Sequence, residues 1–371
     1  MKNSRAKRVI KWTGAGLGVL LVVVIAVIAG AWGMFGTFIQ AANSIEKLED
    51  GLYAMEFAGD YGFDAFLAQG GAKSDGEVAD YLVSFLSHGF YKNKSSAQPG
   101  GFGCSTIFTQ DVNGDYYFGR NYDWAQCRAM IVHTKPINGY ASISTCCLDF
   151  LGFGADYDPD GSMMERIQSI AAVYVPLDGM NDQGLMVADL TAGDDEQTHQ
   201  QTGRPSLTTT TAIRLLLDRA ATVDEAVALL KQYDMHSSIG ISHHLSIADA
   251  AGKSVVVEYV NDEMLVTETK IVTNHYLSAC EKEGIGSAQS HLRYDTLAAY
   301  AGPAGAQEVR RLLESVSQKN YPQTGDGYEK TMWSIVYDPQ ALRADFYFAE
   351  NYGQRYGLSI LGQSGFWERS E

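Results

Sequence analysis

A cysteine, an arginine and an aspartate lie close together in the sequence GFGCSTIFTQDVNGDYYFGRNYDW, which runs from Gly101 to Trp124. Cys104 follows a glycine-rich run, and Arg120 and Asp123 come sixteen and nineteen residues later. A thiol becomes a good nucleophile only when a base or a cation favours its thiolate. No histidine lies near Cys104 in the sequence. The α-amino group of Cys104 itself could serve as the base, because its ordinary pKa of about 7.7 to 8.0 lies near neutrality.

That base exists only if Cys104 becomes the first residue of the chain. The preceding run KNKSSAQPGGFG is rich in Ser, Gly and Pro, which is typical of an exposed loop and of a site where chains are cut. We therefore predict cleavage between Gly103 and Cys104, either by attack of the Cys104 thiol or by a protease. Before that cut the protein would be a zymogen.

The neighbouring elements explain the spacing of the three residues. The segments STIFT and DYYFG flank Asn113-Gly114, a strong signal for a β-hairpin. The returning strand would bring Arg120 and Asp123 beside Cys104. Asp123 could then orient the ammonium group, and Arg120 could favour the thiolate and hold a polar substrate group. The competing interpretation is a surface ion pair beside a buried, unreactive thiol.

The rest of the chain predicts an α+β domain in which sheets lie between helices, because groups of antiparallel strands are interrupted by a helical block. Ser74 and Glu77 form a capping-box signal before a helix that extends to Phe90. Further helices are predicted over residues 207–219, 223–233 and 292–316. Strands are predicted over residues 171–177, 185–190, 244–269, 270–274, 331–339, 345–350 and 357–361.

The first forty residues predict a membrane anchor. They carry five cations and no acid, and an uncharged apolar run extends from Thr13 to Ile39. A run of this length can cross a bilayer with its basic end in the cytoplasm. A cleaved signal peptide and a secreted protein are the alternative, because residues 29–31 resemble a cleavage site. The predicted domains are an anchor at 1–40, a helical pro-segment with the cleavage loop at 41–103, and a catalytic domain at 104–371, all outside the cytoplasm after residue 40.

Charge and cysteine content exclude several classes of partner. Without the five N-terminal cations, 23 Lys and Arg face 44 Asp and Glu, a net charge of about −21 that argues against nucleic acid and anionic lipid surfaces. The five cysteines lie at 104, 127, 146, 147 and 280, and Cys104 is predicted to be unpaired. The pairing of the other four stays open. No metal-binding spacing occurs, and His243 and His244 would face opposite sides of a strand, so neither a metal nor a cofactor is predicted.

The stretch GCSTIFTQDVNGDYYFGRNYDW resembles the start of mature choloylglycine hydrolase-type enzymes, which are N-terminal-nucleophile (Ntn) linear amide hydrolases. This family includes bile salt hydrolases, penicillin V acylases, N-acylethanolamine acid amidase, acid ceramidase and the related acyl-CoA:6-aminopenicillanate acyltransferases. The resemblance covers about residues 103 to 362. It implies an αββα sandwich of two antiparallel sheets between helical layers. It also implies Cys104 as nucleophile, its amine as base, and Arg120 and Asp123 as flanking residues.

Later motifs continue the resemblance in sequence order. The run NDQGLMVADL from Asn181 resembles a family strand, VTNH implies a catalytic Asn274, and SAQSHLRYDTL contributes Arg293. Where bile salt hydrolases and penicillin acylases have an asparagine that helps to hold the oxyanion, this chain has Thr191. A hydroxyl can donate one hydrogen bond, and a backbone N–H can supply another. The substitution favours the acyltransferase, N-acylethanolamine and ceramide branch over a bile salt or penicillin V specialist.

The function predicted from the sequence is an exported, membrane-tethered amidase that forms a thioester on Cys104. Its expected partner is a small-molecule amide with an apolar acyl group: an N-acylethanolamine, an N-acyl amino acid, a ceramide-like lipid or a conjugated bile salt. Two alternatives stay open. The chain could be an acyltransferase that passes the acyl group to an amine, or a surface binding protein that never matures.

Overall fold

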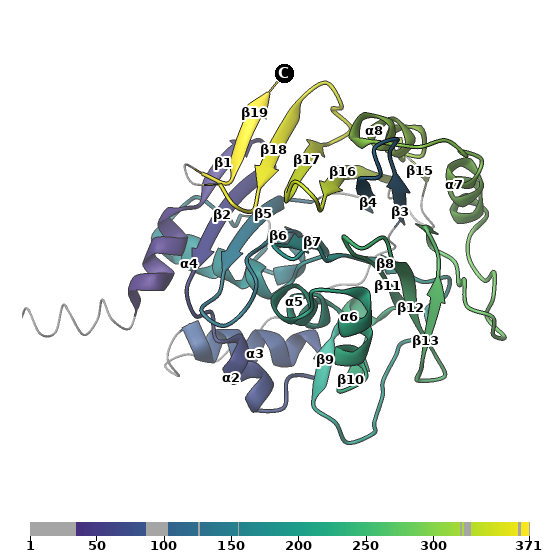
Figure 1. The fold of residues 1–371 in the computed structure, drawn as a ribbon. Coiled ribbons are helices and arrows are strands. Elements are labelled where there is room, and N and C mark those ends of the chain that lie inside the picture. The colour runs from purple at the N-terminus through teal and green to yellow at the C-terminus, as the bar shows by residue number, and fades with distance from the viewer. Residues whose placement is uncertain are drawn as a thin grey trace, which may run out of the picture.

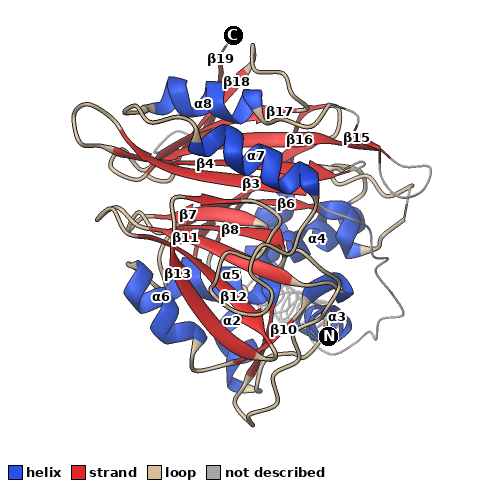
Figure 2. Cartoon of the chain, turned by 90° about the vertical axis from the view of Figure 1, so that its right-hand side faces the viewer, coloured by secondary structure: helices blue, strands red, loops and turns tan. Residues whose placement is uncertain are grey.

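Two large β-sheets face each other, and helices cover the outer face of each sheet (Figures 1 and 2). This computed structural model describes residues 35–86, 103–124, 127–154, 156–319, 321–322, 328–362 and 365–370. Figure 2 shows the four layers in succession, with α7 and α8 above the sheet that contains β3 and β4, and α5 and α6 below the sheet that contains β8 and β11. The layered α+β architecture predicted from the sequence is therefore confirmed.

The first sheet has nine strands in the order β1-β2-β5-β6-β7-β8-β11-β12-β13. The pair β2–β5 is parallel, and the other pairs of this sheet are antiparallel, so the prediction of two antiparallel sheets was wrong for this one. Parallel strands need a long connection, and the hairpin β3–β4 and its flanks separate β2 from β5 in the chain. The strands are β1 Glu46–Glu49, β2 Leu52–Ala58, β5 Ala129–Lys135, β6 Ser142–Cys147, β7 Asp178–Asn181, β8 Met186–Thr191, β11 His243–Ala248, β12 Ser254–Val260 and β13 Glu263–Glu268.

The second sheet has eight strands, ordered β14-β3-β4-β16-β17-β18-β19 with β15 on the side of β16. Its strand pairs are antiparallel. The strands are β3 Gly103–Gln110, β4 Tyr116–Trp124, β14 Ile271–Val272, β15 Tyr321–Pro322, β16 Tyr328–Asp338, β17 Arg343–Phe348, β18 Arg355–Ser359 and β19 Trp367–Ser370. A separate two-stranded parallel sheet pairs β9 Ser206–Thr208 with β10 Asp234–His236.

The helices largely follow the predicted caps and periodicity. They are α2 Phe63–Ala68, α3 Asp75–Leu86, α4 Met163–Ser169, α5 Thr209–Arg219, α6 Val223–Leu230, α7 Ala288–Ala298 and α8 Ala306–Ser315, with 3₁₀ turns η1 Leu148–Leu151, η2 Ile170–Tyr174 and η3 Ser238–Gly240. The single helix predicted over 292–316 is instead two helices, because Gly302 and Pro303 interrupt the pattern. The strand predicted over 171–177 is largely η2, since a short apolar run does not distinguish a buried helical turn from a strand.

Residues 35–86 are part of the main fold. The predicted helix is present as α3, which begins after Ser74, whose hydroxyl accepts the Glu77 backbone N–H at 3.3 Å. The same segment also contributes β1 and β2 to the nine-stranded sheet, so it contains strands as well as the predicted helix. Its side chains Phe57, Phe66 and Leu82 are buried in the core under the helices of that sheet.

The predicted membrane anchor falls almost wholly on residues 1–34, which lie outside the described residues. Within the residues that the structure describes, no helix combines the length and the apolar character needed to span a bilayer.

The core between the two sheets contains Cys104, together with Phe108, Phe118 and Trp333 from the second sheet. On the other side of that sheet, α7 and α8 cover Ile107 and Val336. Gly119 allows α8 to approach β4 closely, because a Cβ at this position would lie 2.5 Å from Val309 Cγ1. This close packing fixes the strand immediately before Arg120.

Because β2 lies inside the nine-stranded sheet, we predict that cutting the chain within residues 87–102 leaves the two pieces associated. An inserted site for a specific protease in that segment should give two fragments that co-elute in size-exclusion chromatography and separate only in denaturant. Tyr53→Asp in β2 should weaken this association because it places a charge in the buried core, whereas Glu46→Gln at the exposed edge strand β1 should not. Separation of the wild-type fragments in native buffer would contradict this role of β2.

Candidate functional site

The β3–β4 hairpin brings the three predicted residues together. Cys104 pairs with Tyr122, Thr106 with Arg120, and Gly103 with Asp123. The turn between the strands closes with Asp111 N–H donating to the Asp115 carbonyl at 2.9 Å. Because side chains alternate along a strand, the Cys104 thiol and Arg120 point into the core between the sheets, and Asp123 points to the opposite face. The predicted hairpin is thus confirmed, with its two charged residues on different sides.

Two side chains hold the backbone of Cys104. Its backbone N–H donates to Asn274 Oδ1 at 2.7 Å, and its carbonyl oxygen accepts a hydrogen bond from Arg293 Nη1. Arg293 Nη2 also donates to Asn274 Oδ1, at 2.7 Å. Asn274 follows β14 and Arg293 lies on α7, so residues 170 and 189 positions away in sequence meet at the start of β3. If the chain is cut before Cys104, this nitrogen becomes the α-amino group.

Thr191 meets Asn274 at the end of β8. The Asn274 side-chain amide donates to the Thr191 carbonyl oxygen and to Thr191 Oγ1, each at 2.9 Å. The two residues that the resemblance assigns to the oxyanion are therefore in direct contact. Both amide hydrogens of Asn274 are directed at Thr191, so an oxyanion bound by this amide would replace one of these two bonds.

Asp123 supports the same corner from the other face of β4. Its Oδ1 accepts from Thr331 Oγ1 at 2.7 Å, and its Oδ2 lies 3.4 Å from Arg293 Nη1. Burial raises the pKa of Asp123, although Arg293 and Thr331 act in the opposite direction. Asp123 thus orients Arg293, which in turn contacts the Cys104 backbone. Thr331 was not identified from the sequence, because a threonine in a strand gives no signal of its own.

Arg120 is fully buried in a cage of acceptors. Its Nε lies 2.8 Å from Asp178 Oδ2, and its Nη2 donates to the Asp189 carbonyl at 2.8 Å. Its Nη1 is buried without a hydrogen-bond partner among the described residues. The guanidinium also lies over the Tyr122 ring, 5.0 Å from the centroid. The structure therefore places one unused donor of Arg120 in the core that contains the Cys104 thiol.

Asp178 was not identified from the sequence, although it is the counter-ion of Arg120. Its carboxylate also accepts hydrogen bonds from three buried donors, Thr145 Oγ1 at 2.5 Å, Trp333 Nε1 at 3.0 Å and Tyr337 OH at 2.6 Å. The available signal was an acid within the otherwise apolar and uncharged run from Val173 to Asn181. A buried acid of this kind needs a cation or several donors, and here it has both.

The Cys104 thiol is strongly protonated in the uncut chain. Burial raises its pKa to about 12, although Arg120 favours the thiolate and so acts in the opposite direction. Cys104 is 2% exposed. The intact chain therefore presents a thiol and not a thiolate at neutral pH.

The hydrogen bonds of the Asn181 side chain do not reach this site, and they lie instead at the β7–β8 turn. Its amide donates to the carbonyls of Leu217 and Ala220 at 3.0 and 2.7 Å, and its Oδ1 accepts the backbone N–H groups of Gln183 and Leu185. All of its hydrogen-bonding capacity holds the β7–β8 turn against the end of α5. The motif that predicts a site residue here is explained by this turn.

A second buried polar cluster lies behind Asn274. Glu258 accepts the backbone N–H groups of Leu277 and Ser278, at 3.0 and 2.7 Å, and pairs with His244 Nδ1 at 3.0 Å. Burial opposes ionisation of Glu258, but His244 and these donors outweigh it and lower its pKa to about 2. The ionised carboxylate thereby fixes the segment that follows Asn274. His243 points the other way and pairs with Asp189 at 2.9 Å, as the predicted alternation requires.

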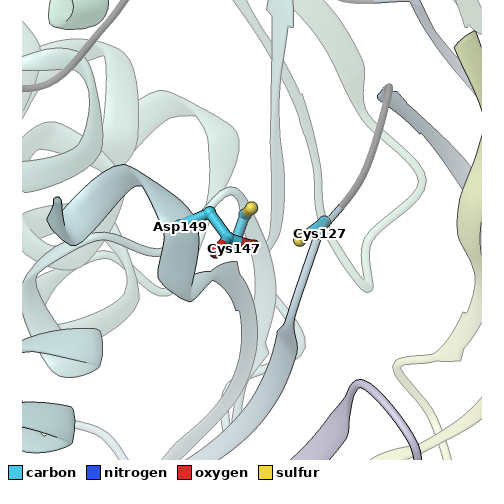
Figure 3. Close-up of side chains that lie close together, drawn as sticks. All are labelled: Cys127, Cys147 and Asp149. Carbon is cyan, nitrogen blue, oxygen red and sulfur yellow. The ribbon is translucent and has the colours of Figure 1, made fainter. Parts of the chain in front are cut away.

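Among the described residues, one group of three side chains has the spacing of metal ligands: Cys127, Cys147 and Asp149 (Figure 3). The side chains that hydrogen-bond to the Cys104 backbone are those of Asn274 and Arg293, and none of these three is among them. The chemistry available around Cys104 is therefore that of a thiol, a nitrogen, and fixed hydrogen-bond donors.

Comparison with known proteins finds similarity over part of the chain. Residues 169–352 match the family model of acyl-coenzyme A:6-aminopenicillanic acid acyl-transferase. A penicillin V acylase from Pectobacterium atrosepticum is 30% identical over 111 residues, which cover 26% of this chain and 29% of that protein. The chain thus aligns with less than a third of the length of this relative.

Two solved structures of conjugated bile acid hydrolase from Clostridium perfringens, both of mutant forms, share the fold. They superpose with TM-scores of 0.51 and 0.52 at 15% identity, covering 72% of this chain and 96% of theirs. In sequence over residues 169–352 and in fold, the chain is thus similar to choloylglycine hydrolase-type enzymes and their relatives.

The histidine next to Asn274 predicts a pH dependence of stability. Burial lowers the pKa of His275 to about 4, and His291, His244 and Arg293 act in the same direction, against Glu258. The unfolded chain binds this proton below about pH 6.5 but the folded chain only below about pH 4, so stability falls as the pH drops through that window. Urea unfolding at pH 7 and pH 5 should show that the loss in wild type exceeds the loss in His275→Gln by about 1 to 2 kcal/mol. The exposed His199→Gln variant is the control and should behave as wild type; equal pH dependence in all three proteins would contradict the assignment.

Proposed function

We propose that this chain is an exported cysteine amidase that matures by a cut before Cys104 and then hydrolyses the linear amide bond of an N-acyl conjugate. The observation that carries the proposal is the hydrogen bond from the Cys104 nitrogen to Asn274, which fixes the future amine beside its own thiol. Similarity to an acyl-transferase family and to a penicillin V acylase supports the reaction class. The apolar N-terminal run of residues 13–39 supports tethering to the membrane with the catalytic domain outside the cytoplasm.

Self-cleavage is favoured over cleavage by another protease. Gly103 is buried and paired with Asp123 in β3, so an external protease has no access to the Gly103–Cys104 bond in the folded chain. The Cys104 thiol is adjacent to that carbonyl. Its attack would move the Gly103 acyl group from nitrogen to sulfur, and water would then release the acid, the thiol and the free α-amine.

The mature enzyme would use the same atoms on its substrate. The Cys104 sulfur attacks the amide carbonyl, the α-amine takes the thiol proton and delivers it to the leaving amine, and the C–N bond breaks to leave a thioester. Water then hydrolyses the thioester and restores the thiol. Asn274 and Thr191 stabilise the oxyanion, and the unused Nη1 of Arg120 attracts the developing thiolate or a polar substrate group.

An acyltransferase is the second candidate, supported by the description of the matched family model. In that case the thioester would be attacked by an amine in place of water. Product analysis with and without an added amine acceptor separates the two reactions. Thr191 in place of an asparagine favours N-acylethanolamines, N-acyl amino acids or ceramide-like lipids over conjugated bile salts and penicillin V as the acyl donor.

We predict that wild type purifies with Cys104 as the N-terminus of its large fragment, whereas Cys104→Ala stays uncut and inactive. Cys104→Ser should be cut slowly, because a hydroxyl can repeat the acyl shift. N-terminal sequencing, intact mass and a panel of the four amide classes measure this. Cys146→Ala, a buried cysteine in the other core, is the control and should be cut and active. A fully active enzyme with Gly103 still joined to Cys104 would overturn the proposal.

We predict that Asn274→Ala lowers kcat/KM by about 100-fold or more, because it removes both the anchor of the Cys104 nitrogen and an oxyanion donor. Asn181→Ala is the matched control. It should lower the melting temperature, since it removes four hydrogen bonds from a turn, yet leave kcat/KM of the folded enzyme nearly unchanged. Equal losses of kcat/KM in both variants would show that Asn274 acts only on folding.

A further inference from the structure

Two buried thiols lie side by side in the core that contains Cys104. Cys127 is 3% exposed and Cys147 is 0% exposed. Their sulfur atoms and an Asp149 carboxylate oxygen all lie within 4.8 Å of one another (Figure 3). Ala129 is the register partner of Cys147, so Cys127, two residues earlier, is its diagonal neighbour on the same face of the sheet.

We propose that Cys127 and Cys147 form a disulfide bond in the exported protein. The compartment rests on the export part of the proposed function, because disulfides persist in oxidising surroundings. A disulfide needs the two sulfurs about 2 Å apart. These sulfurs already lie within 4.8 Å of each other, so rotation of the two side chains has to close the remaining gap. The bond would join Cys127, which lies just before β5, to Cys147, the last residue of β6.

A metal ion explains the cluster less well. Asp149 Oδ2 accepts the Arg128 backbone N–H at 2.7 Å, and Asp149 Oδ1 accepts from Arg128 Nε at 2.8 Å. The carboxylate is therefore already neutralised, and the guanidinium beside it would repel a cation. That leaves two sulfur ligands, whereas structural zinc sites have four ligands.

The oxidation balances as a thiol–disulfide exchange with a small-molecule or protein disulfide. One cysteine sulfur attacks that disulfide and releases one thiol, and the second cysteine then attacks the mixed disulfide and releases the other. The two cysteine protons leave on the two released thiols. Because both sulfurs are buried in the folded chain, the exchange takes place while the chain folds.

The bond has a consequence for the nucleophile. Tyr122 is the register partner of Cys104, stacks on Trp333 with ring centroids 4.0 Å apart, and lies within electrostatic reach of Cys104, Cys127 and Cys147. The thiols of Cys104, Cys127 and Cys147 share one core, so a wrong pairing would be open to them in an oxidising compartment. Joining Cys127 to Cys147 leaves Cys104 without a thiol competitor on this side of the core, because Cys146 packs in the other core.

The test is disulfide mapping of full-length protein that has been exported to an oxidising compartment. After denaturation without reductant and labelling with a maleimide, peptide mapping should show Cys127 linked to Cys147, and three of the five cysteines should be labelled. Cys147→Ala should free Cys127 for labelling, whereas the matched neighbour Cys146→Ala should leave the link intact. Dithiothreitol should lower the melting temperature of wild type by about 5 °C, and it should not change that of the double variant Cys127→Ala/Cys147→Ala.

Five labelled cysteines, a link that includes Cys104, Cys146 or Cys280, or a metal ion that copurifies while both thiols stay free would each overturn the proposal. The mapping does not depend on activity. A linked pair in a chain that is never cut before Cys104 would therefore support the disulfide and contradict the proposed function.

Discussion

The backbone nitrogen of Cys104 is buried, so it needs a hydrogen-bond acceptor, and Asn274 supplies one at 2.7 Å. This single bond joins the first strand of the hairpin to the segment after β14. Arg293 completes the corner, because it donates both to the same Asn274 oxygen and to the Cys104 carbonyl. The position of the sulfur therefore follows from contacts to the backbone of its own residue, which do not depend on the state of the thiol.

Buried charge sets the electrostatics around this corner. Arg120 and Asp178 are both fully buried, and transfer of such ions from water costs several kcal/mol each. The cost is offset by the hydrogen bonds that Asp178 accepts from Thr145, Trp333 and Tyr337. Because these donors already neutralise much of the carboxylate, the guanidinium keeps part of its positive field for the neighbouring sulfur. In a water-free core that field acts at short range with little screening.

The parts of the structure that depend on local signals could be predicted from the sequence. The hairpin follows from Asn113-Gly114 between two alternating runs, and α3 and α6 follow from their caps at Ser74 and Thr222. Cys104, Asp123, Asn274, Arg293 and Thr191 are linked by direct contacts, and Arg120 lies on the thiol side of the same hairpin. What could not be predicted depends on long-range pairing. The strand pair β2–β5 and the Thr331–Asp123 hydrogen bond each join residues more than seventy positions apart in the sequence. Asp178 meets Arg120 from a strand of the other sheet.

Asn181 illustrates why a motif alone is ambiguous. An asparagine in a turn and an asparagine in an active site both need acceptors and donors in fixed directions, so the same residue type serves either purpose. Only the identity of its partners distinguishes the two, and here they are the carbonyls at the end of α5. The side chain of Asn274 instead forms its hydrogen bonds with Cys104, Arg293 and Thr191.

Maturation would alter the charge at this corner more than its shape. In the uncut chain the Cys104 nitrogen is a neutral amide, and burial keeps the thiol pKa near 12. A cut would turn the same nitrogen, in the same hydrogen bond to Asn274, into a group that can carry a positive charge and accept a proton. A cation beside a buried thiol lowers the thiol pKa, and the opposite charges stabilise each other in the low-dielectric core. The fold around Cys104 is thus already complete before the cut, and the missing component is one ionisable nitrogen.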